Sequence, residues 1–470
     1  MKWLFSKLPG LLPNLILKVC FLIVLALMGA MALISDYNRH PDEIQHFEAA
    51  KYYTNHFFPP EIGDPVARES YSPFGDSYLN YHWAEYFFAG KFAFLISPLI
   101  SNQLIATRFF NIFLLISLAA FLLYKARDDY QELILPGFLL ISPQIWYVFS
   151  YINNDGFALF VSILAAYQMA ARNSLLNRFL NSDGFFKNAA GGLFFGLLLG
   201  FLLTAKTNYY AFLLFAALWL LYNTPPLKIT LPFPTVNFNL FGKYVFIFAI
   251  AVSVLTLRCA TDYYINGETN FAGLSYLNYF AGDFEKKKSR LLEYKEAIAE
   301  MPYKPSTIEK NLMNSDPSMK LKEKGTSYAE IFTKWYWHAI SFRSLVGVYG
   351  YLNLFAPDLY YRLMFSLYAA FGLYLTISIL LSRRLESIIQ LLITASASFF
   401  TIFISSYLSW VYAFQAQGRY LFPIIGMLAL LVYANRQHLS KIAIGIFIAG
   451  AFLLSVYSFI FVGLAQINAR

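Results

Sequence analysis

The stretches "ILKVCFLIVLALMGAMALI" (residues 16–34) and "SDYNRHPDEIQHFEAAKYY" (residues 35–53) are adjacent, and their contrast decides the fold class. The first is almost entirely apolar, and an apolar helix of about 20 residues crosses a bilayer. The second carries two neighbouring carboxylates, Asp42 and Glu43, between His40 and His46. The chain therefore places ionisable side chains directly after its first expected membrane span.

The composition extends this prediction to the whole chain. Of its 470 residues, 58% are hydrophobic and only 13% are charged, whereas a soluble domain is about 25% charged. Apolar runs recur, for example at 192–204 and 442–462, so we expect an all-α polytopic membrane protein with the lipid bilayer as its surroundings. The net charge of +9 does not indicate a nucleic-acid partner, because excess Lys and Arg mark the cytoplasmic loops of membrane proteins.

Placing the basic clusters on the cytoplasmic side predicts the topology. It gives eleven spans, with the N-terminus inside and the C-terminus outside, at 16–34, 104–124, 132–150, 156–171, 188–204, 209–222, 244–259, 358–381, 386–403, 420–434 and 442–463. Segment 86–100 is also apolar, but as a full span it would invert every later loop. We therefore expect it to be a juxtamembrane or re-entrant helix.

This topology predicts three parts. They are an N-terminal transmembrane module (1–259) with a first outer loop (36–103), an outer cap subdomain (260–357) and a C-terminal transmembrane module (358–470). The ionisable residues that this topology puts outside, at or near span ends, gather on one face: Asp42, Glu43, His46, His82, Asp155, Lys206, Arg343 and Arg419. Charges near membrane depth are costly and usually functional, so we expect a site at this face.

Each of these motifs also has a plainer interpretation. Asp42 and Glu43 could begin an amphipathic interfacial helix, because acidic residues favour a helix N-terminus. Asp155, in "INND", could be only a helix N-cap. Lys206 and Arg419 could be anchors that extend toward the membrane surface.

The histidines do not have metal-ligand spacing. His46 is therefore more readily a structural hydrogen-bonding group than a ligand. The only two cysteines, Cys20 and Cys259, form no CxxC pair, so zinc-ribbon and dithiol redox chemistry have no basis. No cofactor is predicted, and a divalent cation is left open.

Glycosyl transfer from a lipid phosphate would need this set of residues. The acceptor hydroxyl needs a carboxylate base, and the departing phosphate needs Arg or Lys to hold its charge. Both groups must lie at the membrane surface, because the lipid tail of the donor stays in the bilayer. A groove open to the lipid is also expected, with segment 86–100 and the outer span ends as its walls.

The motifs also resemble a known group. The segments "HPDEIQHFEAAKYY", "INND", "AKTNYY", "SFRSLVGVYG" and "QGRYLFP", in that order, resemble a bacterial family of GT-C-like polytopic membrane proteins with PDExxHF and QGRYxxP motifs. The resemblance implies a GT-C fold, a polyprenyl-phosphate-sugar donor and an active site facing the periplasm from the bacterial inner membrane. It implies Asp42 as base, Glu43 as its acidic neighbour and Arg419 as phosphate ligand.

Further residues are weaker candidates. Asp155 is a second candidate acid, and Lys206 and Arg343 are additional candidates for the phosphate. Other site candidates are His46, His82, Asn154, Gln417 and Tyr420. Two segments depart from the family pattern, "SFR" (341–343) and "LNYHWAEYF" (79–87), and both bear on which sugar or acceptor is used.

The predicted function is an inverting glycosyltransferase that acts on a cell-envelope glycan, lipid or protein acceptor. One alternative is a flippase or exporter of lipid-linked glycans, but transporters favour paired repeats and charges near the bilayer midplane. The other alternative is a polysaccharide polymerase or ligase, which would fit the large late outer loop but not the acidic motif of the first loop.

Overall fold

The computed structural model describes the chain except residues 1, 82–83, 127–129, 229–234, 270–288 and 469–470. Within the described part, regular structure is nearly all helical. The strands form two short antiparallel pairs, β1 (Leu227–Lys228) with β2 (Thr235–Val236), and β3 (Val348–Tyr349) with β4 (Leu354–Phe355). This is the all-α class that the apolar runs predict.

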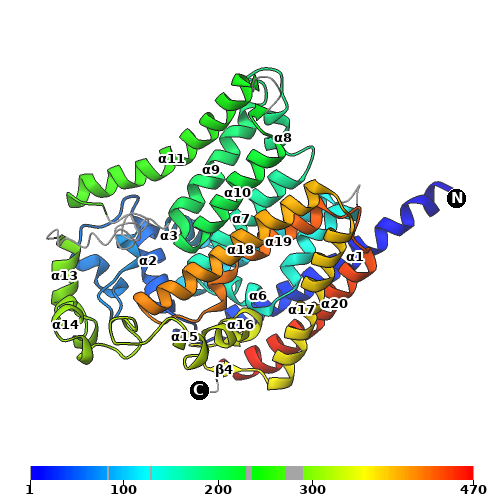
Figure 1. The fold of residues 1–470 in the computed structure, drawn as a ribbon. Helices are drawn as coiled ribbons and strands as arrows, with labels where there is room; N and C mark the ends of the chain where they lie inside the picture. Colours follow the sequence, from blue (N-terminus) through cyan, green and yellow to red (C-terminus); the bar gives the residue numbers. More distant parts are fainter. Residues whose placement is uncertain (1, 82–83, 127–129, 229–234, 270–288, 469–470) are drawn as a thin grey trace.

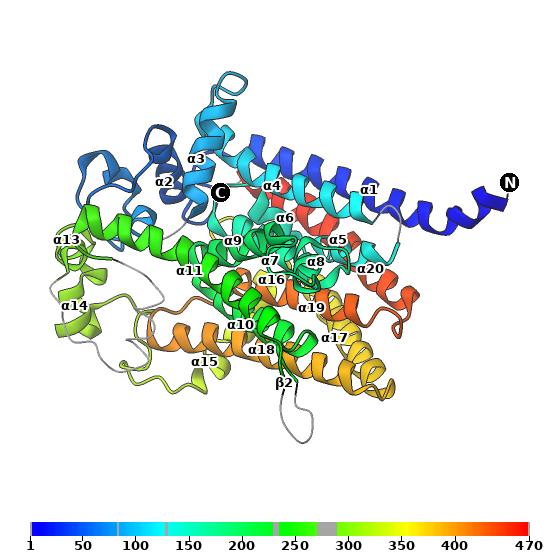
Figure 2. The ribbon, with the colours of Figure 1, turned by 90° about the horizontal axis from the view of Figure 1, so that it is seen from above.

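Six helices in the described residues are long and apolar enough to cross a membrane. They are α1 (Lys2–Ile34), α4 (Gln103–Lys125), α11 (Phe238–Asn266), α17 (Asp358–Leu381), α18 (Leu385–Val411) and α20 (Lys441–Ser458), the last continued by the π-helical turn η9 (Phe459–Leu464). The N-terminus of α1 projects from one end of the molecule (Figures 1 and 2). The protein is thus built as a polytopic α-helical membrane protein.

The eleven spans expected from the sequence reduce to these six helices, or to seven if a bent pair is one span. That pair is α6 (Pro143–Phe149) and α7 (Asn154–Ala170), bent by 116°. Region 132–150 is not one helix but η3 (Tyr130–Leu133), α5 (Ile134–Gly137), η4 (Phe138–Leu140) and α6. Three further predicted spans are the short helices α9 (Ala189–Ala205), α10 (Tyr210–Asn223) and α19 (Pro423–Ala434).

Burial within the protein explains part of the overcount. Helices α6, α7 and α19 are almost entirely buried, whereas only 22% of the apolar window of α11 is buried. A helix enclosed by protein is apolar on every side, just as a helix in lipid is. Hydropathy therefore cannot separate the two environments.

The first predicted outer loop and the predicted cap fold into short elements. From the first predicted outer loop come α2 (Glu43–Asn55), η1 (Pro65–Ser70), η2 (Tyr78–Asn80) and α3 (Ala84–Ile96). From the predicted cap come α13 (Arg290–Ile298), η6 (Met301–Tyr303), α14 (Pro305–Lys310), η7 (Leu312–Asn314), α15 (Glu330–Thr333) and α16 (Trp337–Gly347). Of these elements, α2, α13 and α14 lie at the end of the molecule away from the N-terminus of α1 (Figures 1 and 2). The remaining short helices are α8 (Leu175–Leu180), η5 (Thr207–Tyr209) and η8 (Gly418–Leu421).

The two predicted outer loops are in contact. Lys295 Nζ lies 2.6 Å from Asp76 Oδ2, and the backbone N–H of Glu300 donates to the carbonyl of Pro73 at 3.0 Å. Thus α13 and its following turn pack on the first loop.

Helix α3 covers most of the segment for which we expect a juxtamembrane helix. It has 13 residues, which at 1.5 Å per residue is about 20 Å, too short to cross a bilayer. It lies tightly on α2, because a Cβ at Gly90 would stand 2.4 Å from the carbonyl oxygen of Ala50. This close packing places the N-terminal turn of α3 next to the residues described below.

Candidate active site

Four of the predicted residues form one ionic cluster around Arg419. Its guanidinium lies 3.6 Å from a carboxyl oxygen of Asp42 and 3.6 Å from one of Asp155. Lys206 Nζ lies 2.5 Å from the other carboxyl oxygen of Asp155. We refer to Asp42, Asp155, Lys206 and Arg419 as the charge cluster. Its members come from segments that are far apart in the sequence.

The turn before α7 positions Asp155. The side chain of Asn153 caps the helix by accepting from the backbone N–H groups of Asp155 and Gly156. Asn111 of α4 donates to the carbonyls of Tyr151 (2.7 Å) and Asn153 (3.2 Å), which holds this turn in place. The interpretation of Asp155 as only a helix cap is therefore wrong, since its carboxylate binds Lys206. Asn154, the first residue of α7, is buried beside it.

Asp42 occupies the position before α2 in a left-handed backbone conformation, with φ 57°. Few non-glycine residues adopt this conformation, although Asp tolerates it better than most. The side chain makes no capping hydrogen bond to α2. Helix α2 does begin at Glu43 and buries Phe47, Ala50 and Tyr53, so the amphipathic-helix interpretation is also correct. Asp42 is exposed over 43% of its side chain, which leaves it accessible.

Glu43 has a different environment from its neighbour. It is fully buried, and it accepts a hydrogen bond from Arg108 Nε of α4 at 2.7 Å. The guanidinium also donates to the carbonyls of Ala32 and Ser35, near the end of α1, at 2.8 and 2.7 Å. Burial raises the pKa of the Glu43 carboxyl, and Arg108 opposes this shift. Sequence reasoning missed Arg108, although an arginine inside an apolar span was an available signal.

The two cations of the cluster are buried, with side-chain exposures of 8% for Arg419 and 12% for Lys206. They therefore do not extend to solvent as surface anchors would. Burial lowers the pKa of Lys206 to about 8, although Asp155 opposes the shift. Gln417 accepts a hydrogen bond from Arg419 Nε, and the Tyr420 ring lies 5.1 Å from Lys206 Nζ.

The glycine of "QGRY" is required by packing. A Cβ at Gly418 would stand 2.0 Å from the backbone nitrogen of Leu345, so only glycine fits where η8 crosses α16. The backbones of η8 and α16 are therefore in close contact at this point. It also fixes the direction from which Arg419 enters the cluster.

His46 lies behind the cluster in a layer of aromatic rings. Its Nδ1 hydrogen-bonds the hydroxyl of Tyr86, and its ring stacks on Tyr78 with centroids 4.2 Å apart. Burial lowers the pKa of His46 well below its usual value, and the nearby Arg419 and Lys206 lower it further. His46 is thus a neutral hydrogen-bonding group, as the sequence suggests.

Other candidates are not joined to the cluster. Arg343 pairs with Asp358 at 2.9 Å, where both side chains are well exposed, and it lies over the Tyr361 ring. His82 falls outside the described residues. Within the described part of the chain, no group of three or more His, Cys, Asp or Glu residues is arranged to hold a metal ion.

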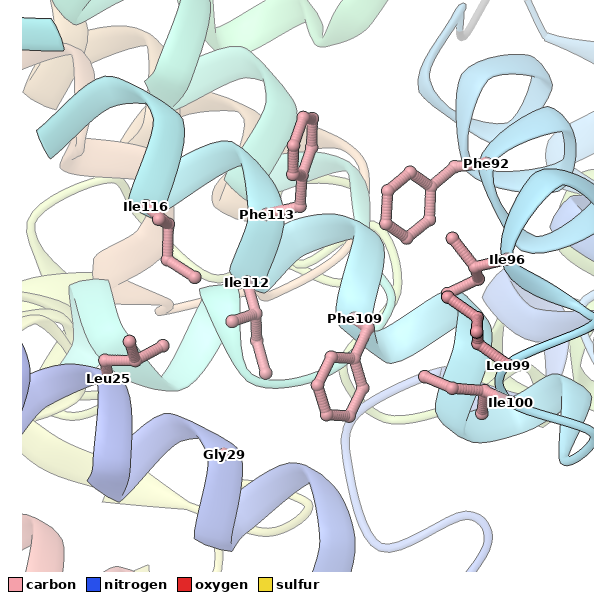
Figure 3. A pocket seen from close by; sticks show the side chains of 10 residues that line it. All are labelled: Leu25, Gly29, Phe92, Ile96, Leu99, Ile100, Phe109, Ile112, Phe113 and Ile116. Atoms are coloured by element: carbon pink, nitrogen blue, oxygen red, sulfur yellow. The ribbon is translucent and has the colours of Figure 1, made fainter. Parts of the chain in front are cut away.

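An apolar groove lies on the outer side of α4, between α1 and α3 (Figure 3). It has a volume of about 310 Å³ and is lined by Leu25, Gly29, Phe92, Ile96, Leu99, Ile100, Phe109, Ile112, Phe113 and Ile116. Phe109, which lines the groove, directly follows Arg108 in α4. Leu25 and Gly29 precede the end of α1 by nine and five residues, which at 1.5 Å per residue places them roughly 8–14 Å along the helix from that end.

No protein-family model matches this chain, and no curated protein matches it either. The site must be judged by its own chemistry. It combines an accessible carboxylate, two buried cations bridged by a second carboxylate, and a neighbouring apolar groove. Such a set can accept a proton at Asp42 and hold an anion at Arg419 and Lys206.

Proposed function

We propose that this protein is a GT-C-type inverting glycosyltransferase that moves a sugar from a polyprenyl-phosphate-linked donor to a cell-envelope glycan, lipid or protein acceptor. We further propose that it works in the bacterial inner membrane, with the charge cluster facing the periplasm. The observation that carries the proposal is the contact of one buried arginine, Arg419, with both Asp42 and Asp155. Through this contact a candidate base, Asp42, lies next to a candidate anion-binding site at Arg419.

Asp42 is assigned as the general base. It is the accessible carboxylate of the cluster, and it lies 3.6 Å from the Arg419 guanidinium. In the proposed step it takes the proton of the acceptor hydroxyl while the acceptor oxygen bonds to the anomeric carbon. The bond from that carbon to the phosphate oxygen breaks, and its electron pair leaves with the phosphate.

Arg419 and Lys206 are assigned to the phosphate, and Asp155 to their positioning. Asp155 is fully buried and contacts both cations, so it is placed to hold them rather than to meet an acceptor. A guanidinium can bind phosphate through two parallel hydrogen bonds. The negative charge that develops on the leaving phosphate would therefore be stabilised where both cations converge.

The apolar groove supports this donor class. Its lining is entirely apolar and comes from α1, α3, α4 and the turn after α3 (Figure 3). Helix α3 leads from the aromatic layer at Tyr86 to the groove at Phe92 and Ile96. A donor with its phosphate at Arg419 would place its hydrocarbon chain in this groove.

A transfer assay tests the proposal. Purified protein would be given a panel of polyprenyl-phosphate-sugars, and sugar release or transfer would be measured for wild type and Asp42→Asn. We expect turnover with at least one donor and its loss in the variant. Movement of an intact lipid-linked sugar across vesicles without turnover would instead favour the flippase.

A further inference from the structure

Helix α3 contributes a third carboxyl group to the neighbourhood of the charge cluster. Glu85, in the first turn of α3, is fully buried. By strict geometry neither of its carboxyl oxygens has a hydrogen-bond partner among the described residues, although its own backbone N–H and the neighbouring Tyr86 lie close enough to act on it. A buried polar group without a partner costs about 1–3 kcal/mol, so its presence calls for an explanation.

Packing directs Glu85 toward α7 and α9. Phe88 lies three residues further along, hence on the same face of the helix. Its ring contacts Phe157 of α7 and Phe201 of α9, with centroids 5.7 and 5.5 Å apart. Asp155 lies in the first turn of α7 and Lys206 caps the C-terminus of α9. Glu85 of α3 therefore faces Asp155 and Lys206.

The electrostatics of the site agree with this placement. Burial raises the pKa of the Glu85 carboxyl well above its usual value, and its own backbone N–H, Lys206 and Tyr86 oppose this shift. Asp155 raises the pKa further. The raised pKa favours the protonated form of this carboxyl group. In that form it offers one hydrogen-bond donor and one acceptor, which matches a hydroxyl group that both accepts and donates.

We propose that Glu85 is a specificity-determining residue that hydrogen-bonds one hydroxyl group of the transferred sugar when the donor phosphate occupies Arg419 and Lys206. This inference rests on the proposed function and adds a recognition contact to the same site. A structural carboxyl would already be paired, as Glu43 is with Arg108. Glu85 instead keeps its hydrogen-bonding capacity for a ligand.

Stability and spectroscopy test the state of the group without any donor. Replacing an unpaired buried carboxyl by Met removes a desolvation cost, so Glu85→Met should unfold at a temperature equal to or above that of wild type. Infrared difference spectra between wild type and Glu85→Gln should show the carbonyl band of a protonated carboxylic acid at neutral pH. A variant that unfolds earlier or does not fold, or the absence of the band, overturns the inference.

Deoxy-sugar donors test the recognition. With polyprenyl-phosphate-sugars that each lack one hydroxyl, wild type should discriminate against one of them by about tenfold or more in kcat/KM. Glu85→Met should lose that discrimination and keep the others, and the control Glu48→Gln, on the Lys51 pair of α2, should keep all of them. An unchanged profile in Glu85→Met overturns this inference alone. No transfer by wild type from any donor overturns the proposed function, and this inference with it.

Discussion

Asp42 and Glu43 are neighbours in sequence, yet they belong to two different kinds of ion pair. The Glu43–Arg108 pair is dry and close, at 2.7 Å, with side-chain exposures of 0% and 1%. The Asp42–Arg419 pair is longer, at 3.6 Å, and the acid is 43% exposed. A buried pair costs desolvation that only good geometry repays. The first pair therefore suits a fixed joint between α1, α2 and α4, whereas the second leaves room for a ligand.

Neutralising each acid separately tests most directly whether the two ion pairs have different roles. Asp42→Asn should lower turnover by roughly 10²–10⁴-fold, the usual contribution of a general base. Its unfolding temperature should stay close to that of wild type, because the Asp42 side chain is 43% exposed. Transfer kinetics and thermal unfolding on the same preparation would check this. Near-normal turnover in Asp42→Asn would remove Asp42 from the role of base.

Glu43→Gln should show the opposite profile. Leaving one partner of a buried pair alone typically costs about 3–5 kcal/mol, so a clear loss of stability is expected from denaturant unfolding. Arg108→Met should cost at least as much, since Arg108 also holds carbonyls at the end of α1. If Glu43→Gln were as stable as wild type but inactive, Glu43 rather than Asp42 would be the general base.

Substituting Arg419, the cation that pairs with Asp42, should give the next largest effect. Arg419→Ala should weaken use of the donor by roughly tenfold or more, because a hydrogen bond to a charged group is worth about 1.5–3 kcal/mol. Arg419→Lys should recover only part, since it lacks the bidentate guanidinium. Arg343→Ala is the matched control, as that arginine pairs with Asp358 on the exposed surface. Equal donor kinetics in Arg419→Ala and Arg343→Ala would contradict the phosphate assignment.

A pH profile distinguishes the role of Lys206. Its lowered pKa of about 8 means that the free enzyme loses this positive charge as pH rises through 8. Because kcat/KM reports ionisations of the free enzyme, donor kcat/KM should fall above about pH 8. Lys206→Arg should lack this fall, since arginine stays charged. A fall that persists in Lys206→Arg would assign it to another group.

The smallest effect is expected at the apolar groove. A Cβ at Gly29 would meet nothing within 4 Å, so Gly29→Leu should fit and fill part of the groove. At about 0.8 kcal/mol per buried methylene, the KM for long-chain donors should rise roughly fourfold to tenfold, with short-chain donors little affected. Gly372→Leu on α17 is the control, since Gly372 also has open space. Equal effects on long and short donors would remove the hydrocarbon chain from this groove.

The candidate site could be predicted in part because charge in an apolar chain is conspicuous. Asp42, Asp155, Lys206 and Arg419 stand at the ends of apolar runs, and the structure brings all four together. Arg343 met the same criterion and lies elsewhere. Arg108 and Glu85 were missed. The sequence shows that a charged residue lies within or beside an apolar run, but it does not show which residue, if any, pairs with it.

The sequence by itself determined that this is an α-helical membrane protein and which ionisable residues stand at its helix ends, since hydropathy and charge are local properties of the chain. Only the tertiary structure decided which apolar helices are enclosed by protein, because burial in protein and burial in lipid favour the same side chains. It also decided that Glu43 joins Arg108 while Asp42 turns to Arg419. That choice depends on a left-handed residue at the start of α2 and on helices distant in sequence, which no local pattern encodes.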